Sequence, residues 1–184
     1  AVERAGVEPG EVENVIMGCA MPKGATGHNV ARHAAIRAGL PVTTGGVTVN
    51  RFCASGVTAI QMAADRIRVG EADVLIAGGA ESMSLVPMGG VKPSFNPEVF
   101  MRDENVGIAY GMGLTAEKVA QQWKVTREMQ DAFALESHMR AVKAQKAGEF
   151  TAEITPIEVT ERTPDLASGE VITKKRTVNL DEGA

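Results

Sequence analysis

The sequence changes from strand-like to helix-like within ten residues, VTVNRFCASG, at positions 47–56. Residues 47–49 are β-branched and predict a buried strand. Small residues follow, and apolar residues then recur at helical spacing and predict one apolar stripe: Val57, Ile60, Ala64 and Ile67. Cys53 therefore lies at a strand-to-helix junction, at or just before the first helical turn.

This position is compatible with two interpretations of Cys53: a nucleophile, or a small buried residue. Free backbone N–H groups and the positive end of the helix dipole gather at a helix N-terminus, where they stabilise a thiolate. The same N–H groups can hold a developing oxyanion, as a nucleophile requires. Most free cysteines are simply small buried residues, so the position by itself leaves both interpretations open.

The surrounding pattern predicts an α/β domain. A strand is expected over residues 12–17, a helix from Asn29 as N-cap to about Ala38, and a strand over residues 74–77. The resulting order, strand–helix–strand–helix–strand, indicates a largely parallel sheet. Gly78 and Gly79 follow, so the end of this strand carries no side chains. We expect them to approach the Cys53 segment closely, because active groups gather at the carboxyl ends of parallel strands; a plain turn is the alternative.

The composition changes after Met88. An irregular loop with two prolines is expected over residues 88–103, and two helices follow, the first capped by Thr115 and the second by Thr126. The first should end near Trp123, and the second near Ala147, before Gly148. A strand is expected around Ile154, Ile157 and Val159, with later turns at 163–165 and 168–169.

Charge and cysteine content exclude several classes of protein. The net charge of −4 does not favour nucleic acid or an acidic membrane as a partner, and no apolar run reaches membrane-spanning length. Two cysteines without CxxC spacing argue against zinc and against a disulfide framework, so no metal is expected. We expect a cytoplasmic protein, with a processed organelle protein as the alternative; the missing initiator Met predicts that the beginning is absent.

Three motifs resemble those of the thiolase family. Residues 50–56, NRFCASG, are similar to its acylation motif, and GGAESMS at 78–84 and MGLTAE at 112–117 follow in the family's order. The resemblance covers the whole chain and is closest to bacterial 3-ketoacyl-CoA thiolases of fatty-acid breakdown. It implies two related α/β halves with an inserted loop domain: residues 1–88 would be most of the first half, lacking its first strand, and residues 89–184 an incomplete loop domain.

The resemblance also implies the activity. Such an acyltransferase cleaves 3-oxoacyl-CoA with CoA, giving acetyl-CoA and a shortened acyl-CoA, and Cys53 matches the nucleophile that holds the acyl group as a thioester. CoA and acyl-CoA would be substrates, no cofactor would be bound permanently, and the protein would be a homodimer or homotetramer.

The family's acid/base groups, a His and a second Cys, belong to a half that this chain would lack. The histidines at 28, 33 and 138 do not match their motifs, and Cys19 is expected to be a buried structural thiol. The segment alone is therefore expected to be inactive.

The resemblance also bears on residues outside the acylation motif. Met112 matches a methionine of the family's pantetheine channel, although core filling is an alternative. Gly111 stands where many short-chain relatives have His, and this smaller residue favours longer acyl chains. His28 replaces a Gln of the family, and loop polarity with helix solvation is the preferred interpretation of His28 and Arg32. The basic residues 174–176 could meet CoA phosphates, but a solvated face is the ordinary role of such a run.

Other functions remain as alternatives. One is a biosynthetic thiolase that forms acetoacetyl-CoA, and another is a decarboxylating or synthase relative. A third is an inactive fragment that serves only as a binding or assembly module. A hydrolase is disfavoured because Cys53 lacks a GxSxG frame. The sequence beyond Ala184 would discriminate among them, through the presence or absence of the His and Cys motifs.

Overall fold

The computed structural model describes residues 1–181, apart from the Ala109 side chain, and divides the chain into two compact units. The first unit is Ala1–Asn96 and the second is Pro97–Ala184. The predicted boundary between residues 88 and 89 concerns the family's domains, and it stays a prediction. In the part of the chain described, none of the helices combines the length and apolarity needed to cross a membrane.

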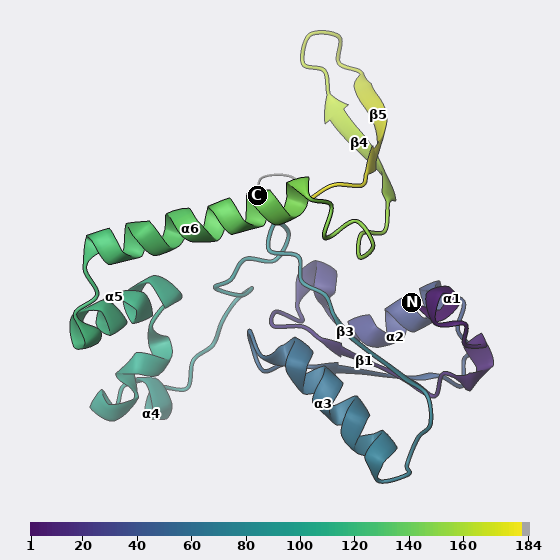
Figure 1. Cartoon of the computed structure of the whole chain (residues 1–184), viewed down its shortest axis with the longest axis horizontal. Coiled ribbons are helices and arrows are strands. Elements are labelled where there is room, and N and C mark those ends of the chain that lie inside the picture. The colour runs from purple at the N-terminus through teal and green to yellow at the C-terminus, as the bar shows by residue number, and fades with distance from the viewer. Residues whose placement is uncertain (182–184) are drawn as a thin grey trace. The chain divides into compact units, whose positions relative to one another are not determined.

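A three-stranded parallel sheet forms the centre of the first unit (Figure 1). Its strands are β1 (Asn14–Gly18), β2 (Gly45–Val49) and β3 (Leu75–Gly79), in the order β2-β1-β3. Ile16 at the middle of β1 pairs with Val47 on one side and Ala77 on the other. The predicted α/β fold with a parallel sheet is therefore confirmed, and all three carboxyl ends lie at one edge.

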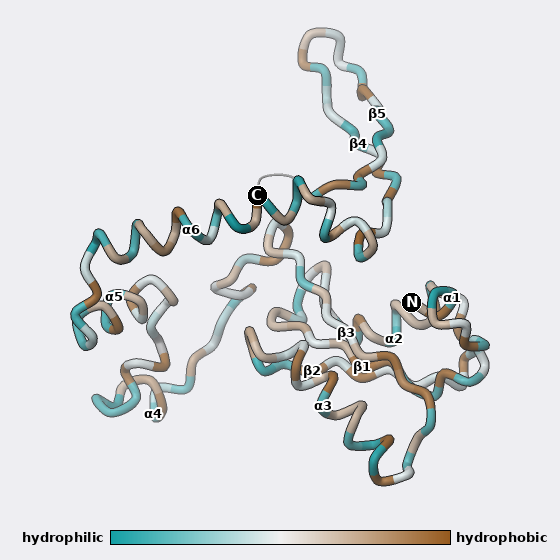
Figure 2. The backbone as a smooth tube through the Cα atoms, in the orientation of Figure 1, coloured by the Kyte–Doolittle hydropathy of each residue, from teal (hydrophilic) through white to brown (hydrophobic). Residues whose placement is uncertain are grey.

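Each face of this sheet is covered by one helix. Helix α2 (Val30–Arg37) covers one face and α3 (Ser55–Arg68) covers the other (Figure 1). Alternate β1 residues serve the two faces, since Val15 belongs to the α2 cluster and Ile16 to the α3 cluster. The brown colour of β1 in Figure 2 reflects this burial on both sides, which is typical of parallel sheets.

Helix α3 packs through a different face from its apolar stripe. Ser55, Ala59 and Ala63 are buried, whereas Val57 and Ile60 are 66% and 59% exposed. Small side chains allow the helix to lie close to the sheet, and the larger apolar residues are left on the outer side. The helix was predicted correctly, but the stripe faces away from this core.

Helix α2 begins at the predicted cap and is tied to β2. The Asn29 side chain accepts a hydrogen bond from Arg32 N at 3.2 Å and donates one to Gly46 O at 2.8 Å. Thr48 Oγ1 donates to the same Asn29 oxygen at 2.8 Å. Three short helices complete this unit: α1 (Val2–Ala5), η1 (Pro9–Glu11) and η2 (Gly24–Thr26).

The second unit contains helices followed by a β-hairpin. The helices are α4 (Pro97–Phe100), the 3-10 helix η3 (Asp103–Ala109), α5 (Met112–Trp123) and α6 (Arg127–Lys146). Thr126 caps α6 as predicted, because its side chain accepts from Met129 N. Thr115 does not cap α5; Gly111 is the N-cap, and Thr115 Oγ1 donates to the Gly111 carbonyl at 3.3 Å from within the helix.

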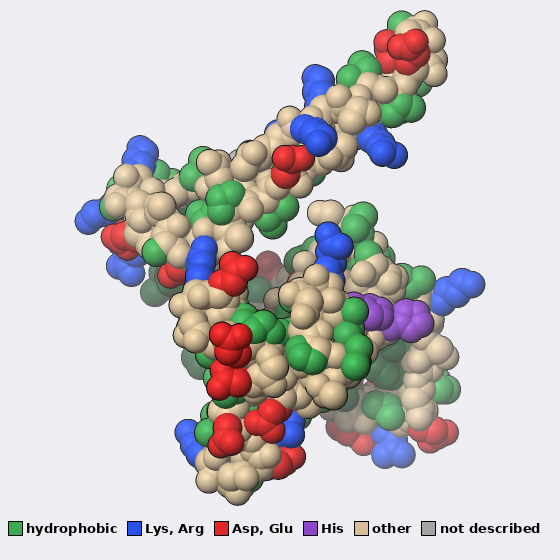
Figure 3. Space-filling model, turned by 90° about the vertical axis from the view of Figure 1, so that its right-hand side faces the viewer, with side chains coloured by type: hydrophobic (Ala, Val, Ile, Leu, Met, Phe, Trp, Pro, Cys, Tyr) green, Lys and Arg blue, Asp and Glu red, His purple; other side chains and the backbone are tan. Residues whose placement is uncertain are grey.

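The hairpin pairs β4 (Ile157–Pro164) with β5 (Val171–Val178). The sequence predicted a strand around Val159, but Ile154 lies before it and the strand extends through Thr163 and Pro164, where a turn was expected. Its partner β5 was missed because its polar residues hide the strand pattern. Acidic side chains lie at the tip of the hairpin and Lys and Arg side chains along it (top of Figure 3).

Candidate active site

A sharp turn joins β2 to α3 and presents Cys53. Phe52, the preceding residue, has a φ of 47°, in the left-handed region that residues with side chains rarely adopt. Its N–H donates to Asn50 Oδ1 at 2.9 Å, while the Ser55 hydroxyl accepts from Arg51 N at 2.8 Å and donates to Phe52 O at 2.6 Å. Side chains on both sides of Phe52 therefore hold the turn.

Cys53 is exposed at the end of this turn, two residues before α3 begins. The first helical hydrogen bond runs from Thr58 N–H to the Ala54 carbonyl at 3.0 Å. The N–H groups of Gly56 and Val57 consequently have no acceptor within the helix. Cys53 thus combines an accessible thiol with a helix N-terminus, as predicted from the sequence, and this arrangement suits a nucleophile.

Gly18 fixes the helix N-terminus against the end of β1. A Cβ atom on Gly18 would lie 2.5 Å from the carbonyl carbon of Ser55 and 2.6 Å from Gly56 N. No side chain fits in that space, so only glycine allows strand and helix to approach so closely. Gly18 was not among the predicted site residues, although a glycine directly after the apolar run of a strand was the available signal.

A Cβ atom added at Gly78 or Gly79 would not meet the Cys53 segment within 4 Å, so the expected close approach of these glycines stays a prediction. A Cβ on Gly78 would meet only Met17 side-chain atoms within 4 Å, and one on Gly79 would meet only the Gly18 carbonyl oxygen. Both glycines pair with β1, the central strand, where Met17 and Gly18 are their partners. Gly18 makes the tight backbone contact with the start of α3.

Glu81 joins the segments that follow β1 and β3. Its carboxylate accepts from Ala20 N at 2.7 Å and from Met21 N at 3.1 Å, and the Cys19 thiol lies 3.7 Å from Oε1. Cys19 is 1% exposed, which confirms the prediction of a buried thiol. Glu81 belongs to the GGAESMS motif, for which no role of this side chain was predicted; in the structure it orders the loop at the carboxyl edge of the sheet.

Arg32 has a structural role in the first unit. Its guanidinium donates to the Thr44 carbonyl and, at 2.9 Å, to the Val42 carbonyl, so it attaches α2 to the loop before β2. These bonds go beyond the helix solvation that was expected. His28 and His33 are exposed with ring centroids 6.3 Å apart, and histidine side chains adjoin one another in Figure 3.

The remaining predicted site residues belong to the second unit. Met112 is the first residue of α5 and is 61% exposed. Two cations of the basic run form ion pairs across the hairpin: Lys175 lies 3.2 Å from Glu158, and Arg176 2.6 Å from Glu161. These pairs favour the interpretation of a solvated face over a phosphate site.

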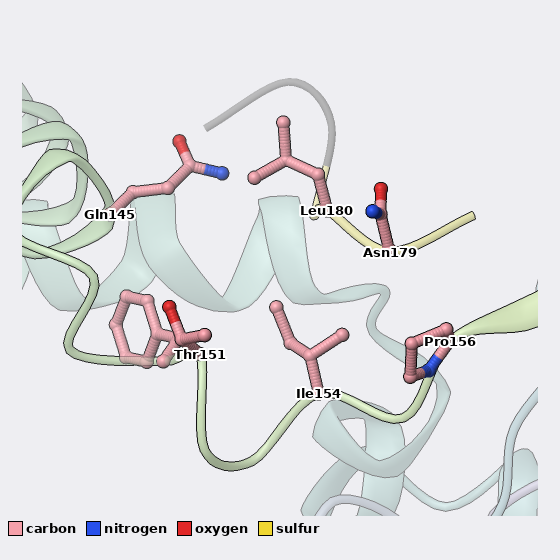
Figure 4. Close-up of a pocket in the computed structure, with 7 residues that line it drawn as sticks. Gln145, Thr151, Ile154, Pro156, Asn179 and Leu180 are labelled. Atoms are coloured by element: carbon pink, nitrogen blue, oxygen red, sulfur yellow. The ribbon is translucent and has the colours of Figure 1, made fainter. Parts of the chain in front are cut away.

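A small pocket of about 220 Å³ lies within the second unit (Figure 4). Thr151 and Ile154, from the loop after α6, lie opposite Gln145 and Leu180, and the Gln145 amide donates to the Asp181 carbonyl. Its lining has no thiol, imidazole or carboxylate: Gln145, Phe150, Thr151, Ile154, Pro156, Asn179 and Leu180. Within residues 1–181 there is also no cluster of three or more His, Cys, Asp or Glu side chains that could hold a metal ion.

Comparison with known proteins connects this geometry to a family. Residues 1–182 match the model of the thiolase N-terminal domain. The chain is 46% identical over 159 residues to the 3-ketoacyl-CoA thiolase of Bacillus subtilis (strain 168), which covers 86% of this chain and 40% of that protein. It is also 46% identical over 174 residues to the acetyl-CoA acetyltransferase of Chromobacterium violaceum. That alignment covers 89% of this chain and 44% of the relative.

A solved structure shows the same relationship. The crystal structure of the Bacillus anthracis acetyl-CoA acetyltransferase matches with a TM-score of 0.77 and 36% identity, covering 99% of this chain and 46% of that one. The chain therefore spans less than half the length of these relatives.

Proposed function

The chain belongs to the thiolase family through its N-terminal domain, and on this premise we propose that Cys53 is the nucleophile of a CoA-dependent acyltransferase. The observation that carries the proposal is the position of Cys53: an exposed thiol, in the family's acylation motif, at the N-terminus of α3. We propose the degradative direction, in which 3-oxoacyl-CoA and CoA give acetyl-CoA and a shortened acyl-CoA.

The reaction uses the Cys53 sulfur twice. The thiolate attacks the 3-oxo carbon, and the bond between carbons 2 and 3 breaks with its electron pair moving to carbon 2. Protonation of that carbon releases acetyl-CoA and leaves the acyl group on Sγ. The thiol of a second CoA then attacks the thioester carbonyl, loses its proton to a base, and regenerates Cys53. The backbone N–H group of Cys53 and those at the start of α3 stabilise the oxyanion of the acyl intermediates.

The proton transfers require a base for the thiol and an acid for the acetyl carbon. Cys19 does not suit either role, because it is buried against Glu81. Within residues 1–181, no hydrogen bond joins the Cys53 thiol to a histidine. We propose that the acid and base belong to a His and a second Cys in the other half of the complete protein.

A thiolysis assay on the complete protein tests this function. Loss of the 3-oxoacyl-CoA enolate absorbance is followed for the wild type, Cys53→Ser and the control Cys19→Ala. We expect Cys53→Ser to lower kcat/KM by at least about 10³-fold, as is usual for removal of a nucleophile. A peptide containing residue 53 should also gain the mass of the acyl group when CoA is withheld. Full turnover by Cys53→Ser would exclude the proposed mechanism.

A biosynthetic thiolase that condenses two acetyl-CoA molecules is the second candidate. The relative from Chromobacterium violaceum, named acetyl-CoA acetyltransferase, is as similar as the 3-ketoacyl-CoA thiolase. Gly111 before Met112 supports longer acyl chains and hence the degradative candidate. The ratio of kcat/KM for a 3-oxo-octanoyl and an acetoacetyl thioester of CoA discriminates between them, since only the degradative enzyme should prefer the longer chain.

The remaining assignments follow from the same proposal. CoA and acyl-CoA are substrates, Met112 lies along the pantetheine arm, and residues 89–184 belong to the inserted domain. The complete protein is a cytoplasmic homodimer or homotetramer without a permanently bound cofactor. A binding or assembly module without chemistry is the alternative, and it predicts CoA binding with no turnover in the complete protein.

A further inference from the structure

The turn before Cys53 contains a residue in a conformation that its own side chain disfavours. Phe52 has a φ of 47°, and a Cβ atom makes this left-handed conformation unfavourable. Phe52 is 65% exposed, so packing of its side chain contributes little to hold this conformation. The conformation must therefore be maintained by groups elsewhere in the turn.

Ser55 supplies that restraint through its hydroxyl group. Oγ accepts from Arg51 N at 2.8 Å and donates to Phe52 O at 2.6 Å, so one side chain bonds the backbone on both sides of Phe52. Ser55 is only 4% exposed, and Gly18 packs against its backbone. The hydroxyl thus attaches the exposed turn to the buried start of α3.

We propose that Ser55 and Phe52 are positioning residues for Cys53. The Ser55 hydroxyl holds Phe52 in the left-handed conformation, and this conformation directs the Cys53 thiol outward beside the N–H groups of α3. Neither side chain takes part in the chemistry. The inference rests on the proposed role of Cys53 as nucleophile, and it adds that Ser55 sets the geometry of attack.

The first test separates positioning from stability. In the complete protein, Ser55→Ala removes both hydrogen bonds of the hydroxyl and should lower kcat about tenfold, with KM within about twofold. Thr44→Val is the matched control: Thr44 is 2% exposed, and its hydroxyl donates to the Val12 carbonyl at 2.8 Å. Both residues precede their strands, at the opposite end of the sheet from the turn. Thr44→Val should lower the midpoint of unfolding while leaving kcat unchanged.

The second test uses the backbone preference of residue 52. Glycine adopts a positive φ without steric cost, whereas in alanine the Cβ atom makes this conformation unfavourable. In a Phe52→Gly background, the loss of kcat on Ser55→Ala should shrink to about twofold or less, because the turn no longer needs the restraint. In a Phe52→Ala background the tenfold loss should persist, which separates removal of the ring from relief of the backbone. If Ser55→Ala alone does not fold, Phe52→Gly should restore the fold and Phe52→Ala should not.

A third measurement needs no substrate. Alkylation of Cys53 by iodoacetamide, followed by peptide mapping, should be several-fold slower in Ser55→Ala and unchanged in Thr44→Val. Equal effects of Ser55→Ala in the Phe52→Gly and Phe52→Ala backgrounds, or a kcat loss no larger than that of Thr44→Val, would overturn the inference. Full turnover by Cys53→Ser would instead refute the proposed function, and the alkylation rates would still report whether Ser55 positions the thiol.

Discussion

Replacing Gly18 with alanine should disturb both the stability and the catalytic geometry of the complete protein. The added Cβ would lie 2.5 Å from the Ser55 carbonyl carbon, 2.6 Å from Gly56 N and 2.7 Å from the Ser55 carbonyl oxygen. All three are backbone atoms, so rotation of a side chain cannot relieve the contact. An ordinary contact of at least 3.4 Å requires a shift of about 0.9 Å between β1 and the first turn of α3.

Such overpacking typically costs about 1–3 kcal/mol of unfolding free energy. A displacement of about 1 Å at a nucleophile can also lower kcat by about 10²-fold. Urea unfolding and the thiolysis assay measure the two effects. Gly56→Ala is the control, because a Cβ there has no atom within 4 Å and alanine favours the helix. Stability and kcat of Gly18→Ala within error of this control would refute the close packing of β1 on α3.

Three further predictions concern other parts of the chain. Mild iodoacetamide should label exposed Cys53 well before buried Cys19, and preferential labelling of Cys19 would contradict the site. The backbone N–H groups of Asp73 and Val74, just before β3, lower the pKa of Glu13 from its ordinary 4.5. Its charged form therefore stabilises the fold above that pH, and the contribution is lost as the pH falls through the lower folded-state pKa. Glu13→Gln should flatten acid unfolding in this range, and an unchanged curve would count against the bonds. Thr126→Ala should destabilise α6 by about 1 kcal/mol through loss of its cap, measured by urea unfolding, whereas no change would show that the cap is dispensable.

Local signals in the sequence were sufficient for most of the first unit. Helix α2 begins at Asn29 because an Asn before an apolar pattern is a strong cap, and β2 follows from its β-branched residues. The order of the strands was not available from such signals. Without it, a close approach at the carboxyl edge was expected of Gly78 and Gly79, and the tight contact of Gly18 on the central strand was not predicted.

The candidate site was predicted only in part, for a related reason. Cys53 could be placed at a strand-to-helix junction because that junction is a change of periodicity along the chain. The conformation of Phe52 and the two bonds of Ser55 could not, because a positive φ at an aromatic residue has no signature in the sequence. The packed face of helix α3 was not predicted either. Small residues form that face, whereas the sequence pattern indicated the more hydrophobic stripe, which is exposed.

The central place of β1 has a consequence for the order in which the chain folds. Its two partners come later in the sequence, and Ile16 meets Val47 about 30 residues on and Ala77 about 60 residues on. At about 5–20 residues per second, a ribosome needs several seconds between the synthesis of β1 and that of β3. During that time β1 has an unpaired edge that can bind other extended chains. Nascent protein arrested before residue 75 should therefore depend on chaperones more than protein arrested after residue 79.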